Sequence, residues 1–336
     1  MSNSALRFFN SLVMSVALVS SVNASFANDI AQESLKLKGK NVSVPAIKWT
    51  DNTVKAKAVL LAIHGGVQHA GVYKAFAEQM APRGILFYSI DLYGHGQWLA
   101  DAASAGAERP KLDYSGSSED VVWLTHQLRE QHPGLPVFCI GESMGASVAL
   151  HALNIEAKLF DGLILASPGT SLHINPDVTP IFESVWHGAK TLGQSIDISG
   201  HLKHISEDPR INEATLTDPK IRKVQSLADL IHSALFVRQN TGLAPKVDPS
   251  IPLLVLQGDK DEICSVKSVD SLYKKFQSTD KSMKTFKGIG HLLVTMDYLK
   301  PEVVASVSDW LDQHLVAVPI ASSASEARLD KTAESP

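Results

Sequence analysis

The sequence predicts an α/β protein: a mostly parallel, doubly wound sheet with a helical cap inserted over one of its edges. Short apolar segments alternate with segments of helical periodicity through most of the chain, which is typical of repeated strand and helix units. Several of these apolar segments are uninterrupted, as expected of parallel strands covered on both faces. The alternation stops at Pro168 and resumes at Pro252, whereas a connection normally takes only about two to six residues. We therefore expect the segment between them to fold as an insertion.

The composition is that of an ordinary globular chain. It has 336 residues, of which 44% are hydrophobic and 20% charged, and this length suits one large α/β domain with an insertion. The formal net charge of -4 and the lack of a Lys/Arg run give no basic surface for nucleic acid, so small or neutral substrates are expected. Two cysteines are too few for a disulfide scaffold. We interpret Cys139 and Cys264 as small apolar fillers, with a bridge between them as the less favoured alternative.

The N-terminal segment has the pattern of a secretory signal peptide. An apolar run over 8–22 follows Arg7, and small residues ending in Ala24 and Ala27 follow the run. The run is shorter than the roughly 20 apolar residues of a membrane-spanning helix, and it contains serines and an asparagine. We predict that residues 1–27 are removed on export, and that the mature protein has no stable membrane insertion.

The elements at the start of the mature chain follow from their local patterns. Apolar and polar residues alternate with period two over 35–49, around Gly39. This pattern indicates an antiparallel hairpin at the edge of the sheet with one solvent-exposed face. Residues 58–63 are continuously apolar and predict a central strand. A helix over 72–80 and a strand over 85–91 complete this part of the core.

A longer helix follows. Ser117 is expected to cap it, with acidic residues in its first turn. Val121, Leu124 and Leu128 share one stripe, which predicts the face that packs on the sheet. The sequence His132-Pro133-Gly134 is expected to end it.

Residues 136–150 then read as a buried strand, a tight turn and the opening of a helix. Ser143 lies at the turn between Gly141 and Gly145, which is the pattern of a nucleophile elbow. Such a turn exposes the serine hydroxyl, and the amide of Met144 at the helix start can donate to a developing oxyanion. The sequence therefore predicts Ser143 as a catalytic nucleophile.

The rest of the chain completes the core and forms the cap. The remaining core elements are a strand over 163–167, a strand from Pro252, a helix over 269–276, a strand over 283–286 and a final helix from Pro301. Inside the insertion, Thr179-Pro180 begins one helix, and helical spacing over 227–235 indicates another. We place the core at 28–168 and 251–315, the cap at 169–250 and a disordered tail at 316–336.

An activated serine needs a histidine base, and the base needs an orienting carboxylate. On an open α/β sheet these residues are expected after the ends of strands, in the chain order serine, acid, histidine. His291 follows the strand over 283–286 and is our candidate base, whereas His95 precedes the serine and is given a structural or pocket-lining role. Asp259 and Asp261 both follow the strand from Pro252, and we favour Asp261 because it lies farther along the loop toward the histidine.

A second amide is needed to bind the oxyanion. The loop after residues 58–63 supplies it, and Gly66 is our candidate, with Val67 next to it. Glu142 lies inside the elbow, so we expect it to point into packing and do not favour it as a second catalytic acid. No cluster has the spacing of metal ligands and no glycine-rich phosphate loop opens a helix, so we predict neither a metal nor a cofactor.

A series of motifs occurs in order over residues 55–315. They are His64-Gly-Gly, Asp91-Leu-Tyr-Gly-His-Gly96, His132-Pro-Gly-Leu-Pro-Val-Phe, Gly141-Glu-Ser-Met-Gly145, Gly258-Asp-Lys-Asp261 and Gly290-His291, and Asp208-Pro209 and Asp218-Pro219 resemble the matching cap pattern. Together they resemble the monoacylglycerol lipase and lysophospholipase branch of the α/β-hydrolases, also labelled serine aminopeptidase-like.

The resemblance implies an α/β-hydrolase fold and a serine hydrolase of acyl esters. It assigns Ser143 as nucleophile, His291 as base, Asp261 as acid, and the amides of Gly66 and Met144 as the oxyanion hole. It implies a small, lipid-like acyl ester as substrate, and with the signal peptide it indicates a periplasmic or secreted bacterial enzyme.

Two departures from the family pattern stand out. Ala146 replaces a glycine that many members carry, which is expected to alter only helix packing. The cap is rich in charged residues and histidines over 201–210, which argues against a continuous apolar lid that docks on membranes.

Two other functions stay open. The first is an aminopeptidase on the same triad, for which Glu183, Glu207 and Asp208 of the cap could bind the substrate amine. The second is a non-catalytic binding protein of the same fold. Relatives that carry out dehalogenation or epoxide hydrolysis place an aspartate at the elbow, so those reactions are disfavoured.

Overall fold

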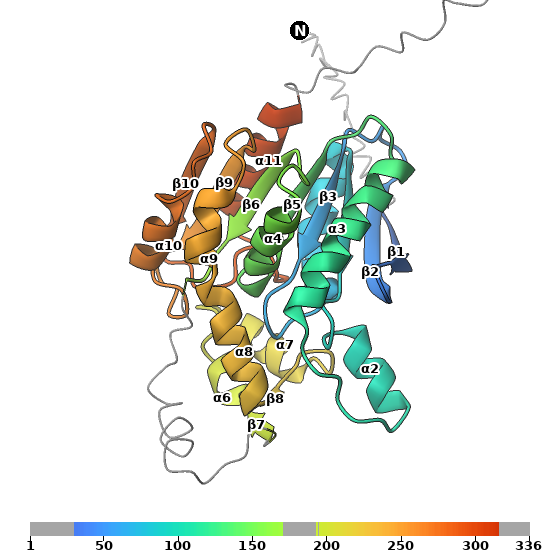
Figure 1. Ribbon diagram of the computed structural model, residues 1–336, viewed down its shortest axis with the longest axis vertical. Coiled ribbons are helices and arrows are strands. Elements are labelled where there is room, and N and C mark those ends of the chain that lie inside the picture. The colour runs from blue at the N-terminus through green and yellow to red at the C-terminus, as the bar shows by residue number, and fades with distance from the viewer. Residues whose placement is uncertain (1–29, 171–192, 194, 316–336) are drawn as a thin grey trace, which may run out of the picture.

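The computed structural model describes residues 30–170, 193 and 195–315. The signal peptide predicted at 1–27, the cap helix predicted from Thr179-Pro180 and the tail predicted at 316–336 lie outside the described residues. Figure 1 shows the described chain as a twisted sheet with helices on both faces and a smaller group of elements below one of its edges.

Eight strands form one sheet in the order β1-β2-β4-β3-β5-β6-β9-β10 (Figure 1). Their bounds are β1 Ile30–Lys38, β2 Ser43–Asp51, β3 Ala58–Ile63, β4 Ile85–Ile90, β5 Val137–Glu142, β6 Gly162–Ala166, β9 Leu253–Gly258 and β10 Lys281–Phe286. β2 pairs antiparallel with β1 and β4, and every other pair in this sheet is parallel. The carboxyl ends of the parallel strands therefore meet at one edge, where open α/β sheets bind their ligands.

Helices bury the sheet from both sides. α3 (Tyr114–Gln131), α4 (Met144–Ile155) and α10 (Val266–Tyr273) pack on one face, and α1 (Lys74–Met80) and α11 (Pro301–Leu315) pack on the other. The alternation of β3 shows this division, because Leu61 shares a cluster with Leu124 of α3, whereas Leu60 shares one with Phe76 of α1. All residues of β3 are buried, which explains its uninterrupted apolar sequence.

The described part of the insertion lies over the carboxyl ends of the parallel strands (Figure 1). It contains β7 (Ser195–Asp197), α6 (Ser199–Leu202), α7 (Pro209–Thr217), β8 (Val224–Ser226), α8 (Leu227–Arg238) and α9 (Asn240–Leu243). The helix predicted over 227–235 is confirmed as α8, which begins with a capping box between Ser226 and Asp229.

Arg222 fastens the cap to the core. Its buried guanidinium donates hydrogen bonds to the carbonyl oxygens of Gly94 at 2.7 Å and Pro110 at 2.9 Å, and it pairs with Asp229 at 3.3 Å. Its backbone amide donates to the carbonyl oxygen of Val67 at 2.8 Å. This one residue therefore joins the cap to two loops that follow strands of the core.

The start of α3 corrects a prediction. Ser117 is not the N-cap, because the helix begins at Tyr114 and the side chain of Asp113 caps it. Ser117 lies one turn inside, and its hydroxyl donates to the carbonyl oxygen of Asp113. Tyr114 is fully buried, so burial of its ring secures the extra turn, and the predicted apolar stripe packs on the sheet as expected.

Two features were not predicted. α2 (Gln97–Ser104) has no buried residue, so no side chain of this helix packs inside the core. β7 and β8 pair antiparallel as a small sheet in an insertion that we expected to be helical, and three residues each are too short to show an alternating pattern. The remaining predicted strands and helices of the core lie where the sequence placed them, within a few residues.

Both cysteines are buried and free. Cys139 lies in β5 and Cys264 in the loop after β9, so the filler interpretation is confirmed and the bridge is absent. Burial raises the pKa of each thiol.

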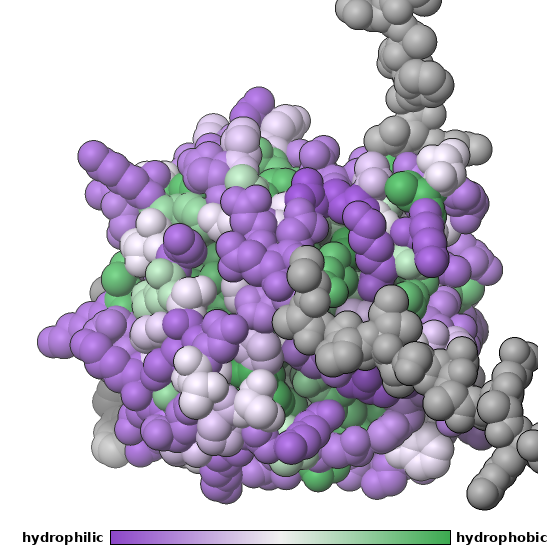
Figure 2. All heavy atoms as spheres, turned by 90° about the horizontal axis from the view of Figure 1, so that it is seen from above, coloured by the Kyte–Doolittle hydropathy of each residue, from purple (hydrophilic) through white to green (hydrophobic). Residues whose placement is uncertain are grey.

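The end of the molecule opposite the cap is largely polar. Figure 2 views this end and shows hydrophilic residues around small, separate apolar groups. Among the helices of the described ranges, none has both the length and the apolar character needed to cross a bilayer.

Candidate active site

Ser143 lies between β5 and α4 in a conformation that residues with side chains rarely adopt. Its φ is 55° and its ψ is -112°, as expected of a sharp turn from strand to helix. The residues two positions away on either side must be glycine: a Cβ on Gly145 would lie 1.9 Å from the carbonyl oxygen of Ile63, and one on Gly141 would lie 2.5 Å from that of Gly145. The turn places Ser143 on the wall of a cavity under the cap.

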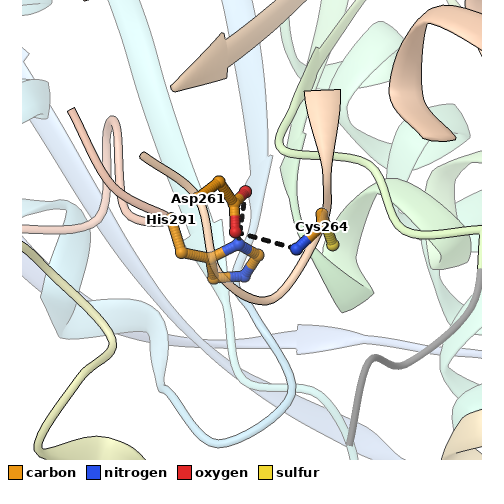
Figure 3. Close-up of side chains that lie close together, drawn as sticks. All are labelled: Asp261, Cys264 and His291. Atoms are coloured by element: carbon orange, nitrogen blue, oxygen red, sulfur yellow. Dashed lines mark hydrogen bonds and ion pairs between the residues drawn. The ribbon is translucent and has the colours of Figure 1, made fainter. Parts of the chain in front are cut away.

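His291 and Asp261 form a buried pair on the loops after β10 and β9. Nδ1 of His291 donates to Oδ2 of Asp261 across 2.9 Å (Figure 3). Because an ionised carboxylate only accepts, Nδ1 carries the proton and Nε2 is left as an acceptor. Asp261 also accepts from the amides of Ile263 and Cys264, both at 2.8 Å, and from Nε2 of Gln257 at 2.9 Å. These bonds fix the carboxylate, and through it the imidazole.

The pair shifts the pKa values of both residues. Burial alone would raise the pKa of Asp261 and lower that of His291. Their mutual attraction and hydrogen bond outweigh burial, so the pKa of Asp261 lies below its ordinary value and that of His291 well above. The imidazole must be neutral to accept a proton, so this arrangement favours catalysis at a pH above the pKa of an ordinary histidine.

The two aspartates that the sequence left as candidates have different partners. Asp261 faces His291, whereas Oδ1 of Asp259 accepts a hydrogen bond of 2.6 Å from the amide of Gly288. Asp259 therefore holds the turn that precedes the histidine loop.

Glu142 points into the protein, as its place inside the elbow predicted. It is fully buried, and it accepts hydrogen bonds from the amides of Leu293 and Val294 and from the hydroxyl of Thr295. Burial raises its pKa, although these three donors and the charge of His291 act in the opposite direction. Glu142 is not among the described residues that line the cavity beside Ser143.

The loop after β3 lies against the nucleophile turn. A Cβ added to Gly66 would lie 3.5 Å from Cβ of Met144. The carbonyl oxygen of Gly65 accepts from Nδ1 of His64 at 2.7 Å and from the amide of Gln68 at 3.1 Å. Because the C=O and N–H of a trans peptide point in opposite directions, these two bonds fix the direction of the Gly66 amide. Both candidate oxyanion residues line the cavity beside the serine.

Two buried histidines support this loop. Nε2 of His95 donates to the carbonyl oxygen of Gly66 at 2.8 Å, which orients the next amide, that of Val67. His64 accepts from the amide of Leu92 at 3.1 Å. Burial lowers the pKa of His95 to about 4 and that of His64 well below its ordinary value, so both rings are neutral near pH 7. The structural role predicted for His95 is confirmed.

A cavity of about 240 Å³ joins these groups. Its core wall includes Gly66, Ser143, Met144 and His291. Its cap wall is mainly apolar and includes Ile198, Leu202, Ile205, Leu230 and Val237, with His201, His204 and Gln225 as polar members. The cavity therefore offers an apolar surface above the serine.

Within the described ranges, one cluster has the side chains of a metal site. The ligand atoms of Asp261, Cys264 and His291 all lie within 4.8 Å of one another (Figure 3). The carboxylate is already saturated by hydrogen bonds, and the raised pKa of the Cys264 thiol disfavours the thiolate that a metal needs. The cluster is explained by the aspartate–histidine pair and a neighbouring thiol.

Sequence reasoning missed the polar side chains that hold the site. Gln68, Gln257 and Thr295 are buried, and each bonds to a loop that carries a candidate catalytic residue. A signal was present, because Gln257 ends an apolar run and Thr295 interrupts one. A polar residue at such a position needs a buried partner, but the sequence does not say which.

The comparisons with known proteins give a family and relatives. A sequence family described as Serine aminopeptidase, S33 (Hydrolase_4) matches residues 54–297. The chain is 28% identical over 277 residues to a monoacylglycerol lipase of Mycolicibacterium smegmatis, covering 80% of this chain and 92% of that protein. It is 27% identical over 275 residues to the monoglyceride lipase of Homo sapiens, covering 79% and 86%. The crystal structure of a Paleococcus ferrophilus monoacylglycerol lipase has the same fold, with a TM-score of 0.65 at 19% identity over 81% of this chain and 100% of that one.

Proposed function

The chain belongs to the serine aminopeptidase S33 family of the α/β-hydrolases, and from this premise we propose that it cleaves esters of single acyl chains. It is a carboxylic-ester hydrolase, and monoacylglycerols and lysophospholipids are the substrates that we expect. The observation that carries the proposal is the single cavity that joins Ser143, His291 and the two candidate oxyanion residues under an apolar cap wall.

Acylation begins with proton transfer from Ser143 to Nε2 of His291 as Oγ attacks the ester carbonyl carbon. Asp261 keeps the proton on Nδ1 and stabilises the imidazolium that forms. The carbonyl oxygen becomes an oxyanion, to which the amides of Gly66 and Met144 donate. The imidazolium then protonates the departing alcohol, which leaves an acyl-serine.

Deacylation repeats the same steps with water. His291 removes a proton from the water as its oxygen attacks the acyl carbon, and the second oxyanion occupies the same two amides. The imidazolium returns its proton to Oγ of Ser143, and the fatty acid leaves. These reaction steps require no external oxidant, reductant or cofactor.

The cap supports an acyl substrate. Leu202 and Ile205 pack in an apolar cluster with Leu292, which directly follows the catalytic histidine. An acyl chain that leaves the ester carbonyl along this wall exchanges water for apolar surface, which favours binding by roughly 0.8 kcal/mol for each buried methylene. His201, His204 and Gln225 supply the polar groups for an alcohol.

The geometry disfavours the aminopeptidase alternative. Glu207 accepts from the amide of Gly290 and pairs with Lys300 at 3.4 Å, and Asp208 caps α7 and pairs with Arg210. Neither carboxylate lines the cavity that holds Ser143, and Glu183 lies outside the described residues.

Ser143→Ala tests the assignment. We expect turnover of p-nitrophenyl esters to fall by roughly a million-fold, because the acyl-serine cannot form. Parental turnover in the purified variant would remove Ser143 from the mechanism. A screen of monoacylglycerols and lysophospholipids graded by chain length, with an aminoacyl amide as comparison, then identifies the substrate.

A fluorophosphonate probe separates the enzyme from the non-catalytic alternative. Labelling of folded parent protein at Ser143, identified by peptide mass spectrometry and lost in Ser143→Ala, supports the hydrolase. A folded parent that neither reacts nor hydrolyses esters supports a binding protein.

We also propose that the enzyme is exported, to the periplasm or the medium of a bacterium. The apolar run behind Arg7 and the small residues up to Ala27 support this. The mass of the protein recovered from periplasmic and culture fractions tests it, because export with processing removes about the first 27 residues. Full-length protein confined to the cytoplasm would contradict the proposal.

A further inference from the structure

The three catalytic segments come from distant parts of the chain. The oxyanion loop follows β3, the nucleophile follows β5, and the histidine loop follows β10. The sheet fixes the positions of the strands. Each loop after a strand needs further contacts to hold its catalytic group at the right distance from the other two. A displacement of about 1 Å in such groups can cost roughly 100-fold in rate.

A buried chain of hydrogen bonds connects all three segments. Oε1 of Gln68 accepts from the amide of Gly65 at 3.0 Å, and Nε2 of Gln68 donates to Oγ1 of Thr295 at 2.8 Å. The Thr295 hydroxyl donates to Oε2 of Glu142. Oε1 of Glu142 accepts from the amides of Leu293 at 2.6 Å and Val294 at 3.1 Å.

Each member lies close in sequence to a catalytic group. Glu142 directly precedes Ser143, and Thr295 lies four residues after His291. The side chain of Gln68 accepts from the amide of Gly65, and its backbone amide donates to the carbonyl oxygen of Gly65, in the peptide that carries the amide of Gly66. The relative exposures are 0% for Glu142 and 2% for Gln68 and Thr295, so water does not compete for these bonds.

We propose that Glu142, Thr295 and Gln68 form a positioning network that sets the oxyanion loop and the histidine loop relative to Ser143. The network rests on the proposed ester hydrolysis. Gln68 lines the cavity that holds Ser143, whereas Thr295 and Glu142 are not among the described residues that line it. Thr295 and Glu142 therefore act through their neighbours rather than on substrate. Breaking the network at either residue should lower kcat and leave KM nearly unchanged.

Thr295→Val is the main test, because valine keeps the branched shape and removes the hydroxyl at the centre of the network. We expect kcat for a p-nitrophenyl ester, per site titrated with a fluorophosphonate, to fall by about 10- to 100-fold. KM should stay within about three-fold, because no substrate contact is removed. Thr295→Ser restores the hydroxyl and should keep kcat within about three-fold of the parent.

Thr125→Val is the matched control. Thr125 is also fully buried, but its hydroxyl donates only to the carbonyl oxygen of Val121 within α3. Thr125→Val should lower the melting temperature about as much as Thr295→Val does, and it should leave kcat unchanged. If kcat of Thr295→Val per titrated site stays within three-fold of the parent, or if Thr125→Val lowers kcat equally, the positioning role is wrong.

Glu142→Gln provides a second route if Thr295→Val does not fold. It keeps the shape and replaces an acceptor by a donor, so it should show the same loss of kcat. In the double variant the combined loss should be smaller than the product of the single losses, because both remove one network. Fully multiplicative losses would overturn the proposal. A parent that is inactive on every ester overturns the proposed function and this inference together, whereas an active parent with unaffected variants overturns this inference alone.

Discussion

The carboxylate of Glu207 in the cap accepts a hydrogen bond of 2.8 Å from the amide of Gly290, the residue before His291. The cap therefore holds the histidine loop as well as roofing the cavity. Glu207→Ala removes this anchor, and we expect kcat on esters to fall by about 3- to 10-fold, whereas Glu207→Gln keeps an oxygen acceptor and should stay near the parent. Steady-state kinetics test this, with the exposed Glu213→Ala of α7 as control. Equal rates for Glu207→Ala and the parent would contradict it.

Asp261→Asn should lower kcat by roughly 1,000- to 10,000-fold, because asparagine does not hold the imidazole in the reactive tautomer. The acid limb of the pH–rate profile should also move. Asp261 raises the pKa of His291, so the parent loses activity as the pH falls through a value above that of an ordinary histidine. Without the carboxylate the imidazole is neutral at lower pH, and the residual activity should persist to lower pH. If the acid limb of the variant lay at the same pH as that of the parent, the limb would not report the protonation of His291.

Asp259→Asn is the companion to that experiment. Asp259 meets the amide of Gly288 rather than the imidazole, and asparagine retains an oxygen acceptor there. Its rate and pH profile should match those of the parent. A large loss of kcat in this variant would reopen the choice of acid.

His95→Gln should make folding less sensitive to acid. Burial lowers the pKa of His95 from an ordinary 6.5 to about 4, so between these values the unfolded chain binds a proton that the native chain does not. Stability is therefore full above about pH 6.5 and falls by about 3 kcal/mol as the pH drops toward 4. Glutamine keeps a donor for the Gly66 carbonyl without titrating. Urea unfolding at pH 7 and pH 5 tests this, and an equal loss of stability in parent and variant would contradict it.

Arg222→Met should loosen the attachment of the cap. Methionine keeps the apolar stem but leaves Asp229 and the carbonyls of Gly94 and Pro110 without their donor, so we expect a loss of roughly 2 to 4 kcal/mol in the free energy of unfolding. Arg210→Met is the control, because its guanidinium is exposed and pairs with Asp208, the N-cap residue of its own helix, and its effect should be small. Equal stability of the two variants in thermal melts would show that Arg222 does not fasten the cap.

The parallel core was predictable from the sequence because burial on both faces leaves an uninterrupted apolar run, as in β3 and β9. The elbow was predictable because Gly141 and Gly145 stand where any Cβ would meet backbone. The start of α3 was not, because Ser117 and Asp113 are both good caps, and burial of Tyr114 decided between them.

The buried hydrogen bonds that hold the site could not be predicted from local sequence patterns. Thr295 bonds to Gln68 and Glu142, which lie 227 and 153 positions away in the chain, so no window of sequence contains the pair. The choice between Asp259 and Asp261 depended on the path of one loop, and the two residues differ little in sequence context.

The cap occupies a single crossover between β6 and β9, which are neighbours in the sheet and pair from Leu163 and Leu253 onward. The register of that pair depends on the strands and not on the length of the chain between them. An ancestor could therefore lengthen, shorten or exchange this crossover without disturbing any strand pair. Acyl preference can then change with the crossover while the strand pairs stay fixed, and a crossover transplanted from a relative needs a counterpart of Glu207 to hold the histidine loop.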